Sequence, residues 1–425
     1  MIKKVDIPYH TGTLPLHVEE SNLKAVILPQ EPATPTLSEK ELVLQALENP
    51  IDSSRLRELA KGKKKILIVT SDHTRAVPSK LTLPLLLAEI RSGEPNAEIS
   101  IIIATGLHRA TTEEEQRQMF GNDIVDNEVI YVHDAHATED MREICTLPSG
   151  AIFKVNRMAL ECDLLVAEGF IEPHFFAGFS GGRKSILPGI ASEDTINTNH
   201  SYKALASPYA ASGVLKNNPI HEDMVVAATA VSLEFILNVA LDTDKKVIAA
   251  FAGNLDTAHL AGCEYISSFA RRDAVEGDIV VTSNGGYPLD QNLYQAPKAV
   301  STAEMCAGEN GVIIMVSSCV DGFGGEYFNE LIVSGTVDEI DEKLSKIPPT
   351  ETIQEQWSAQ VFSRIMKKHT IILVTANISP EIIRKANFIP ATTPDEALEL
   401  AYSLKGSDAK VVVVPDGVAV IIGNR

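Results

Sequence analysis

The sequence predicts an α/β protein of two domains, each with a mostly parallel sheet flanked by helices, with the active site in the cleft between them. Three observations lead to this fold class. The chain has 425 residues, more than a single hydrophobic core usually supports. Apolar runs of strand length alternate with helical patterns in both halves. Polar and glycine-rich segments follow those runs, and open α/β sheets bind ligands beyond the carboxyl ends of their strands.

The predicted strands are continuous apolar runs rich in β-branched residues, the pattern of parallel strands that are buried on both faces. They lie at residues 64–70, 98–105, 163–170, 278–283, 311–318 and 370–376. The first twenty residues alternate like a strand. The tail, residues 409–425, predicts a terminal strand pair that turns at Pro415, Asp416 and Gly417.

Capping residues and helical patterns predict the intervening helices. We expect helices at 38–49 with Ser38 as its N-cap, 110–121 with a threonine cap, near 221–232, and at 392–406 ending on Gly406. A further helix within residues 252–278 joins the halves. We therefore expect an N-terminal domain of residues 1–272 and a C-terminal domain of residues 273–425.

Composition excludes several classes of function. Lys and Arg number 37 against 57 Asp and Glu, a formal charge of −20, which repels nucleic acid phosphates. No apolar run approaches the ~18 to 20 residues that span a bilayer, and the N-terminus lacks the pattern of a secretory signal. We expect a cytoplasmic protein that binds neither nucleic acid nor membrane, with its five cysteines reduced.

Chemically rich segments follow five of the predicted strands. They are Ser71 to Arg75, Gly106 to Arg109, residues 168–200, Asn284 to Lys298, and the glycine-rich segment from Cys319. The segment from Gly178 to Ser185 nearly matches the phosphate loop G-x-x-x-x-G-K-[ST], but Arg183 replaces the second glycine and the loop begins eight residues after its strand. A nucleoside triphosphatase is thereby disfavoured. The alternatives are a turn whose amides hold a phosphate and a plain turn with an exposed Arg–Lys pair.

Three of the eleven histidines, His108, His174 and His200, lie at or beyond strand ends amid glycine and cations. His133 and His136 have the spacing of a metal pair, but their segment resembles a strand entering a loop, which disfavours that role. The sequence contains no recognisable multidentate metal motif. If a metal binds, most of its ligands must come from something other than the chain.

Several motifs together resemble the nickel-pincer-dependent lactate racemase family. They are SDHTRAVPS (71–79), ATGLHR (104–109), the run from Glu168 through NTNH to His200, SNGGYPLDQNLYQAPK (283–298) and QWSAQVF (356–362). The resemblance covers nearly the whole chain. It implies a nickel ion and a pyridinium-3-thioamide-5-thiocarboxylic acid mononucleotide covalently attached at Lys184, with His200 as the nickel ligand from the protein. Square-planar nickel with sulfur donors agrees with the metal's preferences.

The resemblance also implies the remaining roles. His108 and His174 would alternate as general base and acid for the two enantiomers, Arg75 and Lys298 would hold the substrate, and Tyr294, Gln295 and Trp357 would complete its pocket. Ser71 and Asp72 would contact the cofactor or orient a neighbouring cation, although Asp72 also suits a simple turn. Trp357 equally suits a packed helix. On this basis residues 1–272 carry the attachment lysine and the catalytic histidines, and residues 273–425 close over the substrate.

The resemblance favours interconversion of D- and L-lactate by reversible hydride transfer. The alternative is a racemase or epimerase of another 2-hydroxy acid, such as malate or a larger or aromatic analogue, because one or two methylenes change preference by only ~1 to 3 kcal/mol. Implied partners are proteins that make the cofactor and insert nickel. Rival classes are a nucleotide-dependent kinase or hydrolase and a non-catalytic binding protein for small anions, for which two facing histidines would have no purpose.

Overall fold

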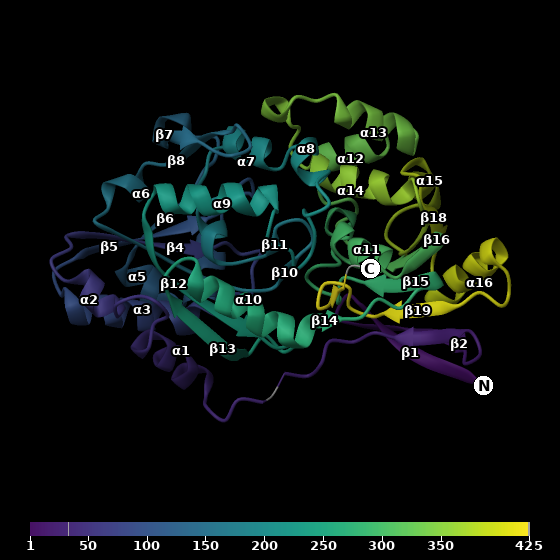
Figure 1. Cartoon of the computed structure of the whole chain (residues 1–425), viewed down its shortest axis with the longest axis horizontal. Coiled ribbons are helices and arrows are strands. Elements are labelled where there is room, and N and C mark those ends of the chain that lie inside the picture. The colour runs from purple at the N-terminus through teal and green to yellow at the C-terminus, as the bar shows by residue number, and fades with distance from the viewer. Residues whose placement is uncertain (33, 424–425) are drawn as a thin grey trace.

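The computed structural model describes residues 1–32 and 34–423, and it contains two six-stranded sheets, each covered by helices (Figure 1). The first sheet is parallel except for β13, which pairs antiparallel with β12. Its strands, in spatial order, are β13 (Val247–Gly253), β12 (Leu233–Leu241), β9 (Leu164–Phe170), β4 (Lys65–Ser71), β5 (Glu98–Ala104) and β6 (Val129–Val132).

The second sheet is parallel throughout. Its strands, in spatial order, are β18 (Ile389–Ala391), β17 (Thr370–Val374), β16 (Ala307–Val316), β15 (Gly277–Ser283), β19 (Val411–Val414) and β3 (Leu23–Val26). Central residues of both sheets are buried on both faces; every residue of β19, for example, is fully buried. Two-domain α/β architecture and the predicted parallel strands are thereby confirmed.

Helices and short strand pairs complete the two units (Figure 1). The helices of the first unit are α1 (Glu39–Glu48), α2 (Leu56–Ala60), α3 (Ser79–Gly93), α4 (Glu113–Phe120), α5 (Asn122–Asn127), α6 (Met158–Glu161), α7 (Glu193–Asn199), α8 (Tyr202–Leu205), α9 (Pro219–Ala230) and α10 (Thr257–Ala270). Those of the second are α11 (Pro297–Glu304), α12 (Glu326–Ile332), α13 (Val337–Ser345), α14 (Gln356–Met366), α15 (Pro380–Lys385) and α16 (Pro394–Lys405). The pairs are β1–β2 (Ile2–Tyr9, Gly12–Glu19), β7–β8 (Met141–Thr146, Ile152–Asn156), β10–β11 (Pro173–His174, Gly178–Phe179) and β14–β20 (Arg271–Arg272, Ile421–Ile422).

The capping residues predicted from the sequence lie at the helix ends in the structure. The side chain of Ser38 caps α1 and that of Thr112 caps α4, each in a capping box with the glutamate three residues later. Gly406 ends α16 with a φ of 97°, in the left-handed region that glycine adopts without strain. Local sequence therefore determines where these helices begin and end.

The N-terminal segment corrects the expected domain limits. Strand β3 pairs with β19 in the second sheet, and the β1–β2 hairpin packs against the same sheet, with Ile7 and Leu16 joining the apolar cluster of Ile279 and Val281. Residues 1–26 thus belong structurally with the C-terminal unit, although the sequence placed them in a domain of residues 1–272. Alternation of apolar residues identifies a strand but not the sheet that it joins, because that depends on contacts far along the chain.

The tail also differs from expectation. Strands β19 and β20 do not pair with each other: β19 lies between β15 and β3, and β20 pairs with β14 at the junction of the two units. Asp416 holds the intervening turn through hydrogen bonds from the amides of Val418 and Ala419. A turn signal between two apolar runs therefore marked a change of direction, not a hairpin.

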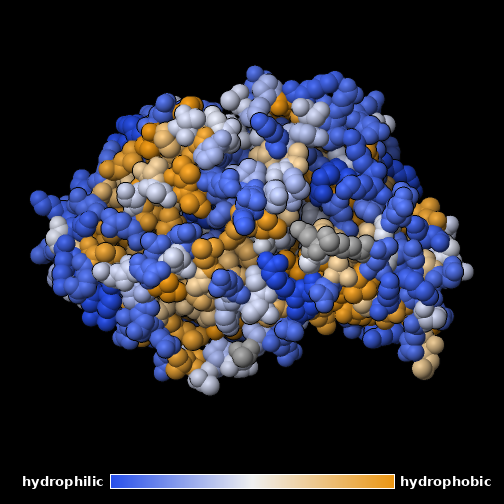
Figure 2. All heavy atoms as spheres, viewed as in Figure 1, coloured by the Kyte–Doolittle hydropathy of each residue, from blue (hydrophilic) through white to orange (hydrophobic). Residues whose placement is uncertain are grey.

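The described part of the chain has no helix long and apolar enough to cross a membrane. On the face shown in Figure 2, hydrophilic residues cover most of the surface, and apolar residues form smaller areas between them.

Leu16→Ala tests the placement of the N-terminal hairpin. Leu16 is fully buried against the second sheet, so we expect a loss of about 2–5 kcal/mol in unfolding free energy. Hydrogen exchange should accelerate in β15, β16 and β19 and remain unchanged in β4 and β5. The exposed neighbour Thr13, changed to Ala, provides the control. Accelerated exchange confined to β4 and β5 would contradict this domain composition.

Candidate active site

A cleft of about 940 Å³ lies between the two units and is lined by residues from both. The loops after β4, β5 and β9 supply one wall, and the loop after β15 together with the first turn of α14 supplies the other. All the site residues predicted from the sequence line it: Ser71, Asp72, Arg75, His108, His174, Lys184, His200, Tyr294, Gln295, Lys298 and Trp357. The carboxyl ends of parallel strands converge on this space, as in other open α/β sheets.

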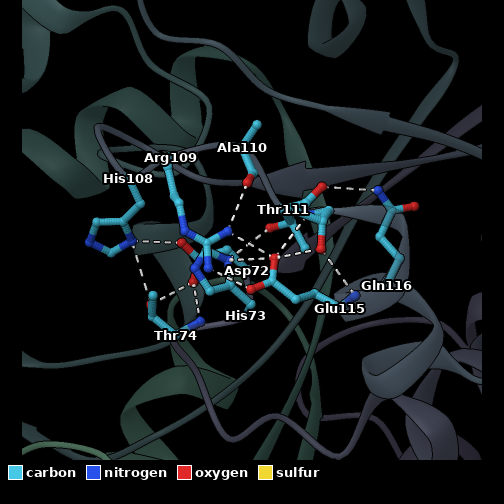
Figure 3. A network of polar contacts seen from close by, with 10 residues as sticks. Asp72, His73, Thr74, His108, Arg109, Ala110, Thr111, Glu115 and Gln116 are labelled. Atoms are coloured by element: carbon cyan, nitrogen blue, oxygen red, sulfur yellow. Dashed lines mark hydrogen bonds and ion pairs between the residues drawn. The ribbon is translucent and has the colours of Figure 1, made fainter. Parts of the chain in front are cut away.

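Buried Asp72 and exposed His108 form a hydrogen bond beyond the ends of two neighbouring strands (Figure 3). Nδ1 of His108 lies 2.6 Å from Oδ2 of Asp72, and the other carboxylate oxygen accepts from the amide and hydroxyl of Thr74. Burial alone would raise the pKa of Asp72, but the interaction with His108 and the charge of Arg75 outweigh burial and lower it. The carboxylate therefore fixes the proton on Nδ1 and leaves Nε2 of His108 as an acceptor.

Glu115 fixes the other end of the His108 loop (Figure 3). It forms a two-pronged ion pair with Arg109, at 2.9 and 2.5 Å, and its carboxylate also accepts from the amide and hydroxyl of Thr112. The hydrogen bond from Arg109 is the largest cause that lowers the pKa of Glu115 to about 2. His108 is thus anchored from both sides, which favours a defined ring orientation.

His174 stands in the opposite hydrogen-bonding state. Its Nδ1 accepts from the amide of Ala177 at 3.3 Å, which leaves the proton of the neutral ring on Nε2. Burial, followed by the charges of Lys184, Lys298 and Arg75, lowers its pKa well below the ordinary value. The rings of Phe175 and Phe176 lie 5.1 and 4.5 Å from its ring, centroid to centroid. His174 is therefore a neutral imidazole held in an apolar wall.

Lys184 occupies a 3₁₀ turn, Gly182–Ser185, and its Nζ lies 5.7 Å from the centroid of the Phe176 ring. Burial lowers its pKa well below the ordinary value, and the charges of Arg183, Arg75 and Lys298 lower it further. Desolvation beside other cations converts a lysine into a neutral, nucleophilic amine. The sequence alternative of a plain turn with an exposed Arg–Lys pair is wrong for Arg183, which is 1% exposed.

His200 caps the C-terminal end of α7 and faces the cleft. Its Nδ1 lies 3.0 Å from the carbonyl of Ile196, so this nitrogen carries the proton and Nε2 has a free lone pair. Burial, then the charge of Lys184, lowers its pKa to about 3. Phe176 and Trp357 meet its ring edge-on at 5.0 and 5.2 Å. A neutral imidazole with one nitrogen fixed by a backbone carbonyl is the arrangement of many metal-binding histidines.

The C-terminal wall is held by a hydrogen bond of 2.7 Å from Nε1 of Trp357 to the hydroxyl of Tyr294. Trp357 is 8% exposed and both packs in the core and lines the cleft, so the two interpretations from sequence hold together. Lys298 lies in the first turn of α11, and burial, then the charge of Arg75, lowers its pKa to about 8. Arg75 from the first unit and Lys298 from the second thus line the same cleft.

Glu355 lines the cleft without having been predicted. It adopts a left-handed φ of 66° just before α14, and its carboxylate accepts from the amide of Phe328 at 3.0 Å. Burial raises its pKa. Glu355 directly precedes the QWSAQVF motif, but nothing in the sequence marks it as a cleft residue, and the turn before α14 brings it to the cleft.

The other metal pattern in the sequence does not form a site. His133 is buried and bonds the carbonyl of Ala191 at 2.9 Å, whereas His136 is exposed and pairs with Glu193. Across residues 1–32 and 34–423, no group of three or more His, Cys, Asp or Glu side chains is arranged to hold a metal ion. Within the described residues, a metal ion could therefore be bound by a single histidine such as His200 but not by a cluster of protein ligands.

The glycine-rich turn also lacks the geometry of a phosphate loop. Strands β10 and β11 separate it from β9, and it leads into a 3₁₀ turn and not directly into an α-helix. The strand–loop–helix arrangement that the motif requires is missing from this part of the structure.

Two families of known domains match the chain in succession. The family "Lactate racemase N-terminal domain" matches residues 9–213, and "Lactate racemase C-terminal domain" matches residues 272–422. The chain belongs to the lactate racemase family. It is therefore an isomerase, as the resemblance of its motifs implied.

Two relatives extend the match over the whole chain. The lactate racemase of Thermoanaerobacterium thermosaccharolyticum is 47% identical over 99% of both chains, and that of Lactiplantibacillus plantarum is 46% identical over 98% of this chain and 99% of the relative. The apoprotein structure from T. thermosaccharolyticum superposes with a TM-score of 0.96, covering 99% of this chain and all of that one. A Thermotoga maritima protein, 21% identical with a TM-score of 0.65 over 92% of this chain and 99% of that one, shares the fold alone.

His133→Gln tests the effect of a buried neutral histidine on this racemase. Burial lowers the pKa of His133 to about 4, whereas an unfolded histidine takes up a proton below about 6.5. Unfolding therefore binds a proton between these values, and stability falls as the pH decreases from 6.5 toward 4. The wild type should lose up to about 1.4 kcal/mol per pH unit more than the variant in this window, measured by urea unfolding at pH 7, 6 and 5. Equal slopes would contradict a neutral His133.

Proposed function

We propose that the protein interconverts D- and L-lactate. The observation that carries this proposal is the pair His108 and His174, which line one cleft in opposite hydrogen-bonding states beside Arg75 and Lys298. The matches to lactate racemases over the full chain support lactate as the substrate. An anion-binding protein would need the cations but not two such histidines.

The cations define the class of substrate. Arg75 and Lys298 lie in a partly buried cleft, where charge-assisted hydrogen bonds to a carboxylate are stronger than in water. Gln295 and Tyr294, on the same wall as Lys298, add hydrogen-bonding groups. A small 2-hydroxy carboxylate can thus be held by its carboxylate, with its hydroxyl directed toward the histidines.

The two histidines suit a proton relay in which His108 is ready to act as the base. Nε2 of His108 is free to accept the hydroxyl proton, because Asp72 holds the proton on Nδ1 and stabilises the imidazolium that forms. Nε2 of neutral His174 carries a hydrogen and can donate a hydrogen bond to the substrate oxygen. To return a proton to that oxygen, the His174 ring must first be protonated on both nitrogens. For the opposite enantiomer the roles exchange. Asp72 therefore acts as the residue that orients His108.

The residues also fit the cofactor that the family resemblance implies. A neutral Lys184 amine can form the thioamide bond, the free Nε2 lone pair of His200 can complete the coordination of nickel, and about 940 Å³ accommodates a mononucleotide together with a small substrate. When bound, such a nickel-pincer nucleotide would supply a hydride acceptor for the hydrogen on C2 of the substrate. The proposal includes partner proteins that make this nucleotide and insert nickel.

Aromatic side chains exclude water around these groups. Phe175 and Phe176 pack on His174, and Phe176 and Trp357 pack on His200. A dry site strengthens the contacts of the substrate carboxylate with the cations and protects a reactive oxidised substrate from side reactions. We place the boundary between the attachment domain and the closing domain near residue 272, with the N-terminal hairpin on the closing side.

Loading of Lys184 and His200 tests this function directly. The chain is expressed with cofactor-making and nickel-inserting proteins, and intact mass, nickel content and lactate racemisation are measured. We expect wild type to carry a nucleotide adduct on Lys184 and stoichiometric nickel. Lys184→Arg should carry neither and be inactive, because a guanidinium cannot form the thioamide. His200→Ala should keep the adduct but lose nickel.

Lys203→Arg is the matched control, since Lys203 is exposed and remote from the cleft lining. Its adduct, nickel content and activity should equal those of wild type. Fully active wild-type protein with an unmodified Lys184 would contradict the attachment, and full nickel content in His200→Ala would contradict the role of His200.

A further inference from the structure

A wholly buried arginine precedes the attachment lysine, and none of the roles above uses it. Arg183 is 1% exposed and is the largest of the fully buried side chains. Burial lowers its pKa to about 10, which leaves the guanidinium charged near neutral pH. A buried charge is costly unless its surroundings satisfy it, so its contacts indicate what it does.

Arg183 forms hydrogen bonds to the backbone of the turn that leads to Lys184. Nη2 donates to the carbonyl of Ala177 at 2.8 Å, and Nη1 donates to those of Ser180 and Gly181 at 3.3 and 3.1 Å. These carbonyls come from the loop after β9, directly before the 3₁₀ turn. One planar guanidinium thus fixes the relative positions of three peptide groups, which a point charge such as a lysine ammonium cannot match.

Two histidines from separate helices hold the guanidinium itself. Nε donates to Nδ1 of His221, on α9, at 3.0 Å. Nε2 of His259, on α10, lies 2.9 Å from Nη1 and 2.8 Å from the carbonyl of Ser180, so it accepts from the arginine in one tautomer and donates to that carbonyl in the other. Burial, then the charge of Arg183, lowers the pKa of both histidines, so they contact the arginine as neutral rings. Within the described residues its hydrogen bonds go to carbonyls and imidazoles and to no carboxylate.

The glycines of the turn fit closely against the same supports. Gly181 and Gly182 have φ values of 76° and 53°. A Cβ on Gly181 would lie 2.8 Å from Oδ1 of Asn238, and one on Gly182 would lie 2.9 Å from the His259 ring. Oδ1 of Asn238 also accepts from the amide of Gly182 at 2.8 Å. The turn therefore packs closely against the polar side chains of Asn238 and His259.

This arrangement differs from ordinary core stabilisation. An apolar side chain of similar volume would fill the space without the cost of desolvating a charge. What the guanidinium adds is geometry: it holds the loop and the 3₁₀ turn in one shape, with Lys184 Nζ directed over Phe176 into the cleft.

We propose that Arg183, supported by His221 and His259, is a positioning residue that presents the Lys184 amine for covalent attachment of the cofactor. The proposal rests on the proposed function for the identity of the attached group. It assigns Arg183 to loading of the enzyme and not to turnover, because its side chain contacts the turn and not the cleft.

Arg183→Lys tests the proposal, since it keeps a positive charge but loses the planar fork. In apoprotein, hydrogen exchange of amides 178–186 should accelerate about tenfold or more, while β4, β5 and β15 remain unchanged. In cells with the cofactor pathway, the fraction of folded chains carrying the Lys184 adduct after a fixed short time should fall about tenfold, the size typical for losing the support of a ligating residue. Racemisation per adduct should stay at the wild-type value.

Leu86→Ala is the matched control, because Leu86 is fully buried on α3 in a separate apolar cluster. It should lower the melting temperature while leaving adduct per folded chain unchanged. If Arg183→Lys yields no folded protein, His221→Leu, which removes one acceptor, replaces it and should give a smaller loss in the same direction.

Wild-type loading in Arg183→Lys, or an equal loss in Leu86→Ala, would overturn the proposal. Unchanged exchange of amides 178–186 would overturn it independently of the cofactor. Absence of any adduct on wild-type protein would instead count against the proposed function, and the exchange measurement would still decide whether Arg183 holds the turn.

Discussion

The active-site cleft depends on a group of positive side chains that lie close together, partly buried, without ion pairs to carboxylates of the described residues. Within residues 1–32 and 34–423, no carboxylate forms an ion pair with Arg75, Lys184 or Lys298. Desolvation, followed by repulsion from neighbouring cations, lowers the pKa values of both lysines. A buried cluster of like charges is unfavourable unless anions complete it. The carboxylate substrate and the negatively charged cofactor that we propose would supply those anions.

The same constraint explains the state of the histidines. Burial, followed by the charges of neighbouring cations, lowers the pKa of His174 and of His200. This favours the neutral imidazole that the proposed metal-ligand role of His200 requires. His108 differs because Asp72 lies beside it. One carboxylate, beside one of the two histidines, therefore gives them different hydrogen-bonding states, and hydrogen bonds from Thr74 keep that carboxylate in place.

Much of the fold and the cleft was predictable from local sequence. Apolar β-branched runs predicted the parallel strands, and caps such as Ser38 predicted helix ends. The rule that ligands bind at strand ends predicted that the site residues share one cleft, which they line. Other features depend on contacts between distant segments. Strand β3 joins the second sheet through β19, and Arg183 is buried only because α9 and α10 supply His221 and His259. The local sequence predicts what kind of structure a segment forms. The segments that it contacts depend on how the whole chain packs.

The fate of the hydrogen on C2 of lactate tests the account most directly. Under the proposed function, His108 and His174 would exchange protons with the substrate oxygen. A cofactor attached at Lys184 would accept hydride from C2 beside Phe176 and Trp357, which pack on His200. Racemisation of lactate deuterated at C2 by the loaded enzyme in ordinary water should therefore leave the label at C2 in both enantiomers. Loss of the label to solvent at the rate of racemisation would show removal of a carbon-bound proton and contradict the account.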